Sequence, residues 1–291
     1  MRDNPKSKIQ NPKSALQELW HYRPLILELV RRDLKLRYKN SIGGIAWSLL
    51  NPLLQIFVIT VLMKFIEARP IENYSAYLFG IIFLWNFFDL CLQDGCVSIL
   101  LNAQLVRKVY FPREILPLAS VLSNLFHFGI AFVFTILYFF VPYGFGGVGA
   151  YPSLLRPEIL MVLPAVFFTA VLALGCSLVL SYLNVFYEDV KFIVTAVMRL
   201  AFYAMPVFAT IEQIKIKVPQ EIYQLYMLNP IAVFLVTYQR ALLPPPARYT
   251  PAEAVTIPYG YFALACLSST LILALGFYLF QKYKWEMAER L

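Results

Sequence analysis

The chain has 291 residues, of which 60% are hydrophobic and only 14% charged, and its mean hydropathy is +0.64. Soluble domains carry roughly a quarter charged residues, so this composition excludes an ordinary soluble domain and predicts a membrane protein. A formal net charge of +8 would suggest a nucleic-acid partner for a soluble protein, but in a membrane protein its distribution along the chain has to be read first.

The first 44 residues are largely polar and end in a basic cluster. The basic residues of this cluster are Arg31, Arg32, Lys35, Arg37 and Lys39. On a helix over residues 25–41 the apolar face would consist of Leu27, Val30, Leu34 and Tyr38. The pattern predicts an amphipathic helix at the membrane interface, with its basic side chains toward anionic lipid or a cytoplasmic partner. A cluster that only fixes topology is the alternative. No secretory signal is expected, because this polar segment precedes the first apolar run.

Six apolar stretches are long enough to cross a membrane, which takes about 20 mostly apolar residues. They are residues 45–66, 76–94, 115–141, 159–183, 191–212 and 260–280. A seventh stretch, 222–243, is weaker because it contains several polar residues and the Asn229-Pro230 pair. We therefore expect an all-α polytopic membrane protein. Its six-helix transmembrane domain would cover 45–281, between the N-terminal cytoplasmic segment 1–44 and a cytoplasmic tail, 282–291.

The distribution of Lys and Arg predicts that both ends of the chain are cytoplasmic. With six spans, 17 of the 25 basic residues fall on the cytoplasmic side and six in the outer loops. If residues 222–243 also crossed, the basic tail would lie outside. The interpretation is therefore a re-entrant or interfacial helical hairpin within 213–258, on the outer side between spans five and six.

The sequence lacks the motifs of several kinds of site. No glycine is followed by lysine, so there is no phosphate-binding loop of the G-x-x-x-x-G-K-[ST] type. Two histidines are too few for a multi-histidine metal site, and the four cysteines have no metal-ligand spacing. No G-x-S-x-G motif occurs. We expect no catalytic site, no metal and no cofactor in this chain, and any uphill transport would take its energy from another subunit.

Arg199 is the most informative of the few charged residues within the spans. It lies eight residues after Lys191, hence about 12 Å deep on a helix. A buried arginine is costly unless it is paired or faces water. Two interpretations stay open: an ion pair with Asp89 or Asp94 of the second span, or contact with a phosphate of the substrate.

Three segments occur in a fixed order relative to the spans. They are RRDLKLRYKNS running into GGIAWSLLNPLL, LVRKVYFPREILPLASVLSNL at 105–125, and NVFYEDVKFIV at 184–194, followed by MLNPIAVF at 227–234. Together they resemble the membrane subunit of a type-2 ABC exporter of lipid-linked cell-surface polymers, the family that handles O-antigen polysaccharide, capsule and wall teichoic acid. The resemblance runs from about Leu29 to Gln281. Glu188 departs from it, because many relatives carry Arg at that position.

The resemblance implies a homodimer of this chain in the bacterial cytoplasmic membrane, paired with two copies of a separate ATPase subunit that binds ATP and Mg. Loop 102–114 would contain the coupling helix that docks on the ATPase, with exposed aromatic anchors inside a basic rim. The turn 184–191 would approach the same partner. The expected contacts are Arg107, Lys108, Val109, Tyr110, Phe111, Arg113, Glu188 and Asp189. For the loop, topology with interfacial aromatic residues is the alternative.

The resemblance also implies a path for the polymer. The basic cluster would admit the phosphate-bearing lipid head. Candidates for the path itself are Phe57, Arg199, Tyr203 and Phe208. Packing is the alternative role for these aromatic residues, because aromatic residues make up 16% of the chain. The hairpin within 213–258 would form an outer gate or would only cap the dimer.

Two other functions fit parts of this pattern. A drug or small-molecule exporter of the same superfamily would often carry larger outer domains or a fused ATPase, and would lack the YFPRE loop. A polytopic membrane glycosyltransferase would need acidic catalytic residues on a loop, where this chain offers only Glu114 and the pair Glu188-Asp189 inside. A nucleic-acid partner is not expected, because a membrane span follows the basic cluster at once. Both a polysaccharide and a teichoic acid fit as the polymer.

Overall fold

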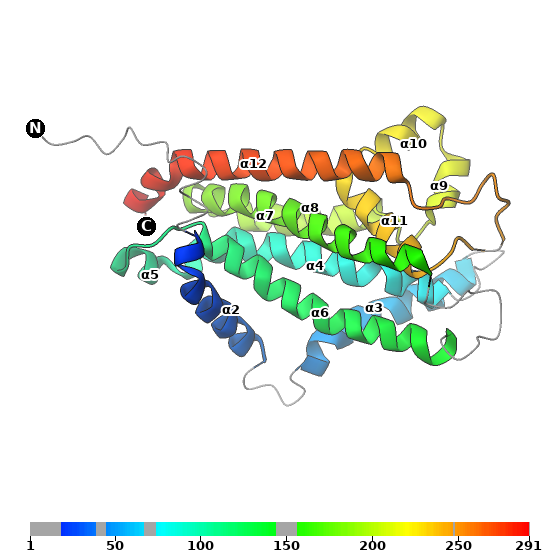
Figure 1. The fold of residues 1–291 in the computed structure, drawn as a ribbon, viewed down its shortest axis with the longest axis horizontal. Coiled ribbons are helices and arrows are strands. Elements are labelled where there is room, and N and C mark those ends of the chain that lie inside the picture. The colour runs from blue at the N-terminus through cyan, green and yellow to red at the C-terminus, as the bar shows by residue number, and fades with distance from the viewer. Residues whose placement is uncertain (1–18, 39–44, 67–73, 144–155, 247, 291) are drawn as a thin grey trace, which may run out of the picture.

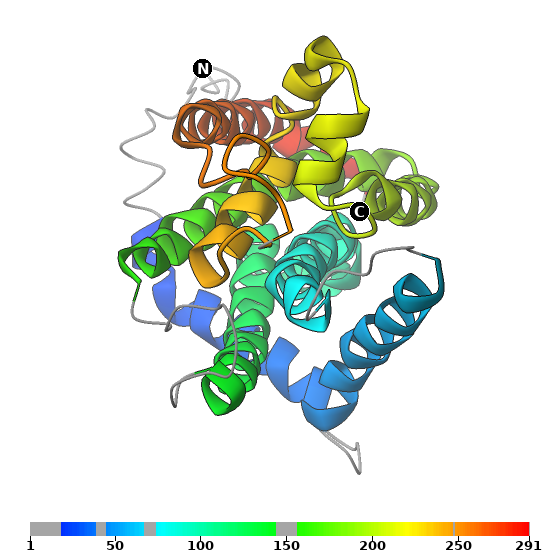
Figure 2. The same ribbon diagram turned by 90° about the vertical axis from the view of Figure 1, so that its right-hand side faces the viewer.

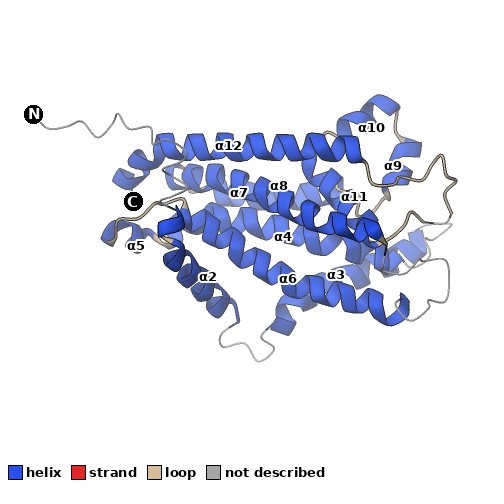
Figure 3. Ribbon diagram, viewed as in Figure 1, coloured by secondary structure: helices blue, strands red, loops and turns tan. Residues whose placement is uncertain are grey.

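The computed structural model describes residues 19–38, 45–66, 74–143, 156–246 and 248–290. Within these ranges the chain forms helices joined by turns and extended segments, with no strand (Figure 3), which confirms the all-α class. The helices are α2 (Arg23–Tyr38), α3 (Ile45–Ile66), α4 (Tyr74–Leu101), α5 (Ala103–Lys108), α6 (Ile115–Tyr143), the 3-10 helix η2 (Pro157–Met161), α7 (Val162–Phe186), α8 (Val190–Ala204), α9 (Ile211–Lys217), α10 (Gln220–Tyr226), α11 (Pro230–Leu242) and α12 (Tyr259–Arg290).

Helix α4 is the centre of the bundle. Helices α3, α6, α7, α8 and α11 all pack against it, and the view down the bundle shows them around it (Figure 2). Of the apolar window of α4, 78% is buried, compared with 22% for α3 and 17% for α12. In a membrane the outer faces of α3 and α12 are left for lipid or for another protein chain, because lipid tails are as apolar as a protein core.

Five helices of the described chain are long and apolar enough to cross a membrane. They are Leu49–Ile66, Tyr74–Leu101, Ile115–Phe139, Pro157–Phe186 and Tyr259–Met287. They coincide with five of the six predicted spans, although α4 continues to Leu101 and α12 to Arg290. The protein is therefore a membrane protein with several apolar helices, and residues 282–290 continue the last helix.

The predicted continuous helix over 191–212 is wrong. Helix α8 ends at Ala204, and Pro206 follows within a buried turn, because proline has no N–H to continue the helical ladder. A capping box of Thr210 and Gln213 then starts α9. The carbonyl oxygens exposed by the break are bound by α4, since the hydroxyl of Tyr77 donates to Pro206 at 2.9 Å and that of Tyr74 to Val207 at 2.6 Å.

The weak apolar stretch 222–243 forms two short helices, α10 and α11. The Asn229-Pro230 pair starts α11: Pro230 is in its first turn and the Asn229 side chain accepts a hydrogen bond from the Ile231 N–H. Every residue from Ile231 to Leu242 is buried, and α11 packs between α4, α7 and α12. Its polar residues therefore face protein.

Helices α7 and α12 touch through two glycines, a pairing that lets membrane helices approach closely. A Cβ on Gly276 would lie 2.4 Å from the carbonyl oxygen of Gly175. We expect Gly276→Ala to destabilise the protein by about 1–3 kcal/mol, because backbone atoms would have to move apart. Gly260→Ala is the matched control on α12, since a Cβ there meets nothing. Equal thermal unfolding temperatures in detergent for the two variants would contradict this packing.

Candidate functional site

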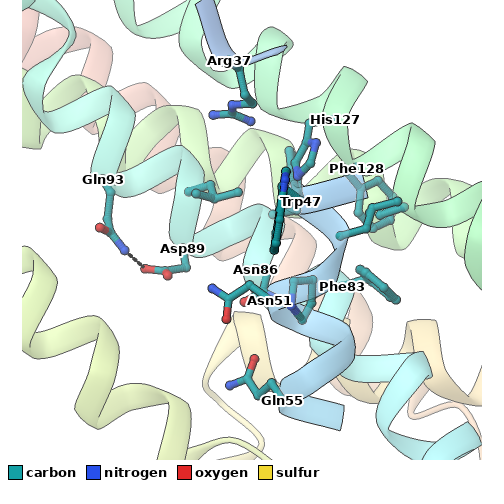
Figure 4. Close-up of a pocket in the computed structure, with 15 residues that line it drawn as sticks. Arg37, Trp47, Asn51, Gln55, Phe83, Asn86, Asp89, Gln93, His127 and Phe128 are labelled. Carbon is teal, nitrogen blue, oxygen red and sulfur yellow. Dashed lines mark hydrogen bonds between the residues drawn. The ribbon is translucent and has the colours of Figure 1, made fainter. Parts of the chain in front are cut away.

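A cavity of about 470 Å³ lies between α3, α4 and α6, beside the end of α2 (Figure 4). Its polar lining consists of Arg37, Asn51, Gln55, Asn86, Asp89, Gln93 and His127. Its aromatic lining consists of Trp47, Phe83, Phe87 and Phe128. Ligand sites in proteins commonly have this size and combine apolar walls with a few polar groups.

Helical spacing explains why these side chains meet. Trp47, Asn51 and Gln55 follow one another at intervals of four residues on α3, so they share one face. The polar residues of α4 at positions 86, 89 and 93 share a face in the same way. Because α3 packs along α4, the two polar faces border one space.

Several polar groups of the cavity have no hydrogen-bond partner among the residues that the structure describes. Gln93 donates to Asp89 at 2.7 Å. The amides of Asn51, Gln55 and Asn86 make no hydrogen bond to any residue that the structure describes. These amides carry both donors and acceptors, so they are available to a ligand or to water.

Arg37 links the end of α2 to α4 through an ion pair. Its Nη2 lies 2.8 Å from Oδ2 of Asp94 on α4, and that same oxygen accepts a hydrogen bond of 2.9 Å from Asn124 on α6. Next to this ion pair, the Tyr38 hydroxyl and Nδ1 of His127 are 2.7 Å apart. The other terminal nitrogen of Arg37, Nη1, is buried and has no hydrogen-bond partner in the described part of the chain. This unused donor belongs to a residue that lines the cavity.

A second cavity, of about 430 Å³, lies on the other side of the Arg37–Asp94 pair. It is lined by Arg32, Asp33, Leu36, Arg37, Asp94, Ser98, Leu101, Asn102, Ser120 and Ser123. Arg37 lines both cavities, so the ion pair lies where two polar spaces adjoin. The second cavity extends toward α5, since two of its lining residues, Leu101 at the end of α4 and Asn102 at the N-cap of α5, directly precede that helix.

The predicted apolar face of the N-terminal helix is wrong in part. Leu27 is 55% exposed, whereas Ile26 and Leu29 are buried, because α2 packs through them against the end of the bundle and along α6. Of the predicted phosphate-binding residues, Arg31 pairs with Glu28 at 2.8 Å in an exposed position, and Arg32 contacts Asp33 at 2.7 Å and Asn102 at 2.6 Å. Lys35 is exposed, and Lys39 lies outside the described residues.

Loop 102–114 contains the expected short helix, α5, at the end of the molecule where α12 finishes (Figure 1). Arg107, Lys108, Val109 and Tyr110 are exposed, Tyr110 at 73%. Phe111, which was predicted to be exposed, is only 5% exposed, because it joins the apolar cluster that includes Ile26 and Leu29. The exposed aromatic anchor is Tyr110 alone.

Two contacts hold the remainder of this loop against α12. The Arg113 guanidinium donates to the carbonyl of Lys284, and the Gln281 amide donates to the buried carboxyl of Glu114. Burial lowers the pKa of Arg113, with Glu114 acting in the opposite direction. The turn between α7 and α8 carries Glu188 and Asp189, both exposed, at this same end (Figure 1).

The structure does not form either predicted ion pair of Arg199. Asp94 is bound to Arg37 and Asp89 to Gln93, and Arg199 is exposed on α8. Two path candidates do meet: the rings of Tyr203 and Phe208 stack with centroids 5.5 Å apart and an angle of 13° between them. Phe57 is exposed on α3. These aromatic residues belong to elements that flank α4.

Sequence reasoning missed the amides and Trp47 of the cavity. The signal that could have found them is the four-residue spacing of polar side chains inside apolar stretches, in α3 and again in α4. It also missed a buried ion pair between Arg240 of α11 and Glu212 of α9, which are 1% and 0% exposed. The stretch around Arg240 has the composition of a weak span, so the sequence prediction places Arg240 among the basic residues of the outer loops.

Comparison with known proteins gives consistent matches over most of the chain. The family model described as "ABC-2 type transporter" matches residues 24–243. The O-antigen export system permease protein RfbA of Klebsiella pneumoniae is 27% identical over 267 residues, covering 91% of this chain and 94% of that protein. The protein of the same name from Myxococcus xanthus is 28% identical over 274 residues, covering 94% and 98%.

Proposed function

The chain belongs to the ABC-2 type transporter family, and from this membership we infer that it is the membrane-spanning subunit of an ABC exporter that moves a lipid-linked, O-antigen-type polymer across the cytoplasmic membrane. The observation that carries the polymer assignment is the end-to-end similarity to two O-antigen export permeases. The chain supplies the path, and a separate ABC ATPase supplies the energy, binding ATP and Mg.

We propose six crossings with both chain ends on the cytoplasmic side. The fifth crossing is α8 together with residues 205–210, because α8 alone would span only about 22 Å of a hydrocarbon core of about 30 Å. Irregular backbone is tolerated at membrane depth when it is buried in protein and its polar groups are bound, as Tyr74 and Tyr77 bind this segment. Helix α11 is shorter still and would be the inner arm of the outer re-entrant hairpin.

The cytoplasmic end would carry the partner surface. It groups α5, the turn with Glu188 and Asp189, and the basic end of α12 (Figure 1). Tyr110 with Val109 inside a rim of Arg107 and Lys108 has the composition of an interaction hot spot. We propose that two ATPase subunits dock here on a dimer of this chain.

The substrate would be admitted beside α2. An anionic lipid head is attracted by Arg31, Arg32 and Lys35 on the cytoplasmic side. The polymer would then follow a route past exposed aromatic side chains, on whose faces sugar rings stack. The stacked rings of Tyr203 and Phe208 would offer such faces, and Arg199 lies one turn before Tyr203 on α8.

The test is reconstitution of the chain with its ATPase in lipid vesicles. We expect lipid-linked O-antigen-type polysaccharide to stimulate ATP hydrolysis several-fold over the lipid carrier alone. Lipid-linked teichoic acid and a panel of cationic drugs are the comparison substrates. Stimulation by drugs with none by either polymer would overturn the proposal in favour of a small-molecule exporter, and sugar transfer without ATP would favour a glycosyltransferase.

A further inference from the structure

The cavity of Figure 4 has the lining of a sugar site. Amides and a carboxylate supply donors and acceptors on several sides, which is what the hydroxyl groups of a sugar ring require. Trp47 adds an aromatic ring, 61% exposed, against which the apolar face of a sugar can lie. A lipid tail would leave the amides of Asn51, Gln55 and Asn86 unpaired, and that is costly away from water.

Arg37 stands where this cavity meets the second one. One terminal nitrogen of its guanidinium binds Asp94, and the other is buried with no partner among the described residues. Guanidinium groups bind phosphate through two parallel hydrogen bonds, so a phosphate at this point would engage the free nitrogen and compete with Asp94 for the bound one. Asp94 would keep its hydrogen bond from Asn124 when Arg37 leaves it.

We propose that this cavity binds the sugar next to the lipid phosphate of the substrate, and that Arg37 exchanges Asp94 for that phosphate. The ligand class is a glycosylated lipid phosphate, and the site would recognise the junction between its sugar and its phosphate. The exchange would break the ion pair at the border of the two cavities and remove this contact between the end of α2 and α4. This inference rests on the proposed function and adds to it a recognition site and the contact that opens it.

The experiment measures binding of three probes to the intact complex with its ATPase in lipid nanodiscs. The probes are a short prenyl diphosphate carrying one N-acetylhexosamine, the same prenyl diphosphate without sugar, and the free sugar. We expect the glycosylated diphosphate to bind about tenfold more tightly than the bare one, as a few added hydrogen bonds would give. The free sugar should bind too weakly to measure.

Variants test which residues bind the sugar of the ligand and which bind its phosphate. Replacing both Gln55 and Asn86 by Leu should remove the tenfold preference for the sugar while leaving the bare diphosphate unaffected. Arg37→Gln should weaken both diphosphates. Asp94→Asn should tighten both, because it removes the competitor for Arg37; weaker or unchanged binding would overturn the exchange. Gln224→Leu is the control, since it removes an exposed amide of α10.

Failure of this inference can be told apart from failure of the proposed function. If the wild-type complex binds both diphosphates equally while lipid-linked polymer still stimulates ATP hydrolysis, the sugar site is refuted and the exporter assignment stands. If neither diphosphate binds and the polymer does not stimulate ATP hydrolysis, the exporter assignment is refuted, and the sugar site, which rests on it, is refuted as well.

Discussion

Glu212→Ala is expected to cost about 3–5 kcal/mol of folding free energy, because it leaves Arg240 charged and buried without its partner. The two side chains are 0% and 1% exposed. The Glu212 carboxylate also accepts a hydrogen bond of 3.2 Å from the Val255 N–H. One carboxylate therefore joins α9, α11 and the extended segment before α12. Loss of it should loosen the whole end of the protein that carries α9 and the start of α12.

Thermal unfolding in detergent measures this effect, with Glu221→Ala as the control because Glu221 is exposed on the neighbouring helix α10. The control should change the stability by no more than about 0.5 kcal/mol. Replacing the pair together, by Leu at 212 and Met at 240, should restore most of the stability, since apolar residues of similar volume commonly substitute for a buried ion pair. If Glu212→Ala is as stable as the control, the expected cost is wrong, because Arg240 then forms hydrogen bonds with water or with another acceptor.

The long apolar helices could be predicted from the sequence because length and composition alone identify them. Five of the predicted spans correspond to helices of the structure, and Asn229-Pro230 starts α11 as its residue types suggest. The break after Ala204 was missed because residues 205–210 are as apolar as a span. Only Pro206 and the Thr210 capping box distinguish them, and both are short-range signals.

Which face of a helix is buried could not be read from hydrophobicity. In lipid an outward face is as apolar as an inward one, so the apolar pattern of α2 or of loop 102–114 does not tell Leu27 from Leu29 or Tyr110 from Phe111. Polar residues inside apolar stretches are more informative, because each needs a partner or a cavity. By this criterion, the polar residues at positions 51, 55, 86, 89 and 93 identify the site. The same criterion predicts that Arg240 pairs with an acidic residue, which the structure shows to be Glu212.

Tyr110→Ala is expected to weaken binding of the ATPase subunit roughly 30-fold, which corresponds to about 2 kcal/mol for loss of an interfacial tyrosine. Its side chain is 73% exposed at the proposed docking end and stands next to exposed Val109. The residues after it hold the loop rigidly: Phe111 is buried, and Arg113 donates to the backbone of Lys284. A side chain presented from a fixed support loses little conformational freedom on binding, so it contributes much of its contact energy.

Affinity between the purified chain and its ATPase measures the effect, and polymer-stimulated hydrolysis should fall with it. Tyr278→Ala is the matched control, because Tyr278 is comparably exposed but lies in the membrane-spanning part of α12. Tyr110→Phe should keep most of the affinity, since the ring supplies the buried area. Phe111→Ala would act through the fold of the loop and lower the unfolding temperature as well. If Tyr110→Ala binds the ATPase like the control, the docking surface lies elsewhere on this end, and the turn with Glu188 and Asp189 becomes the next surface to replace.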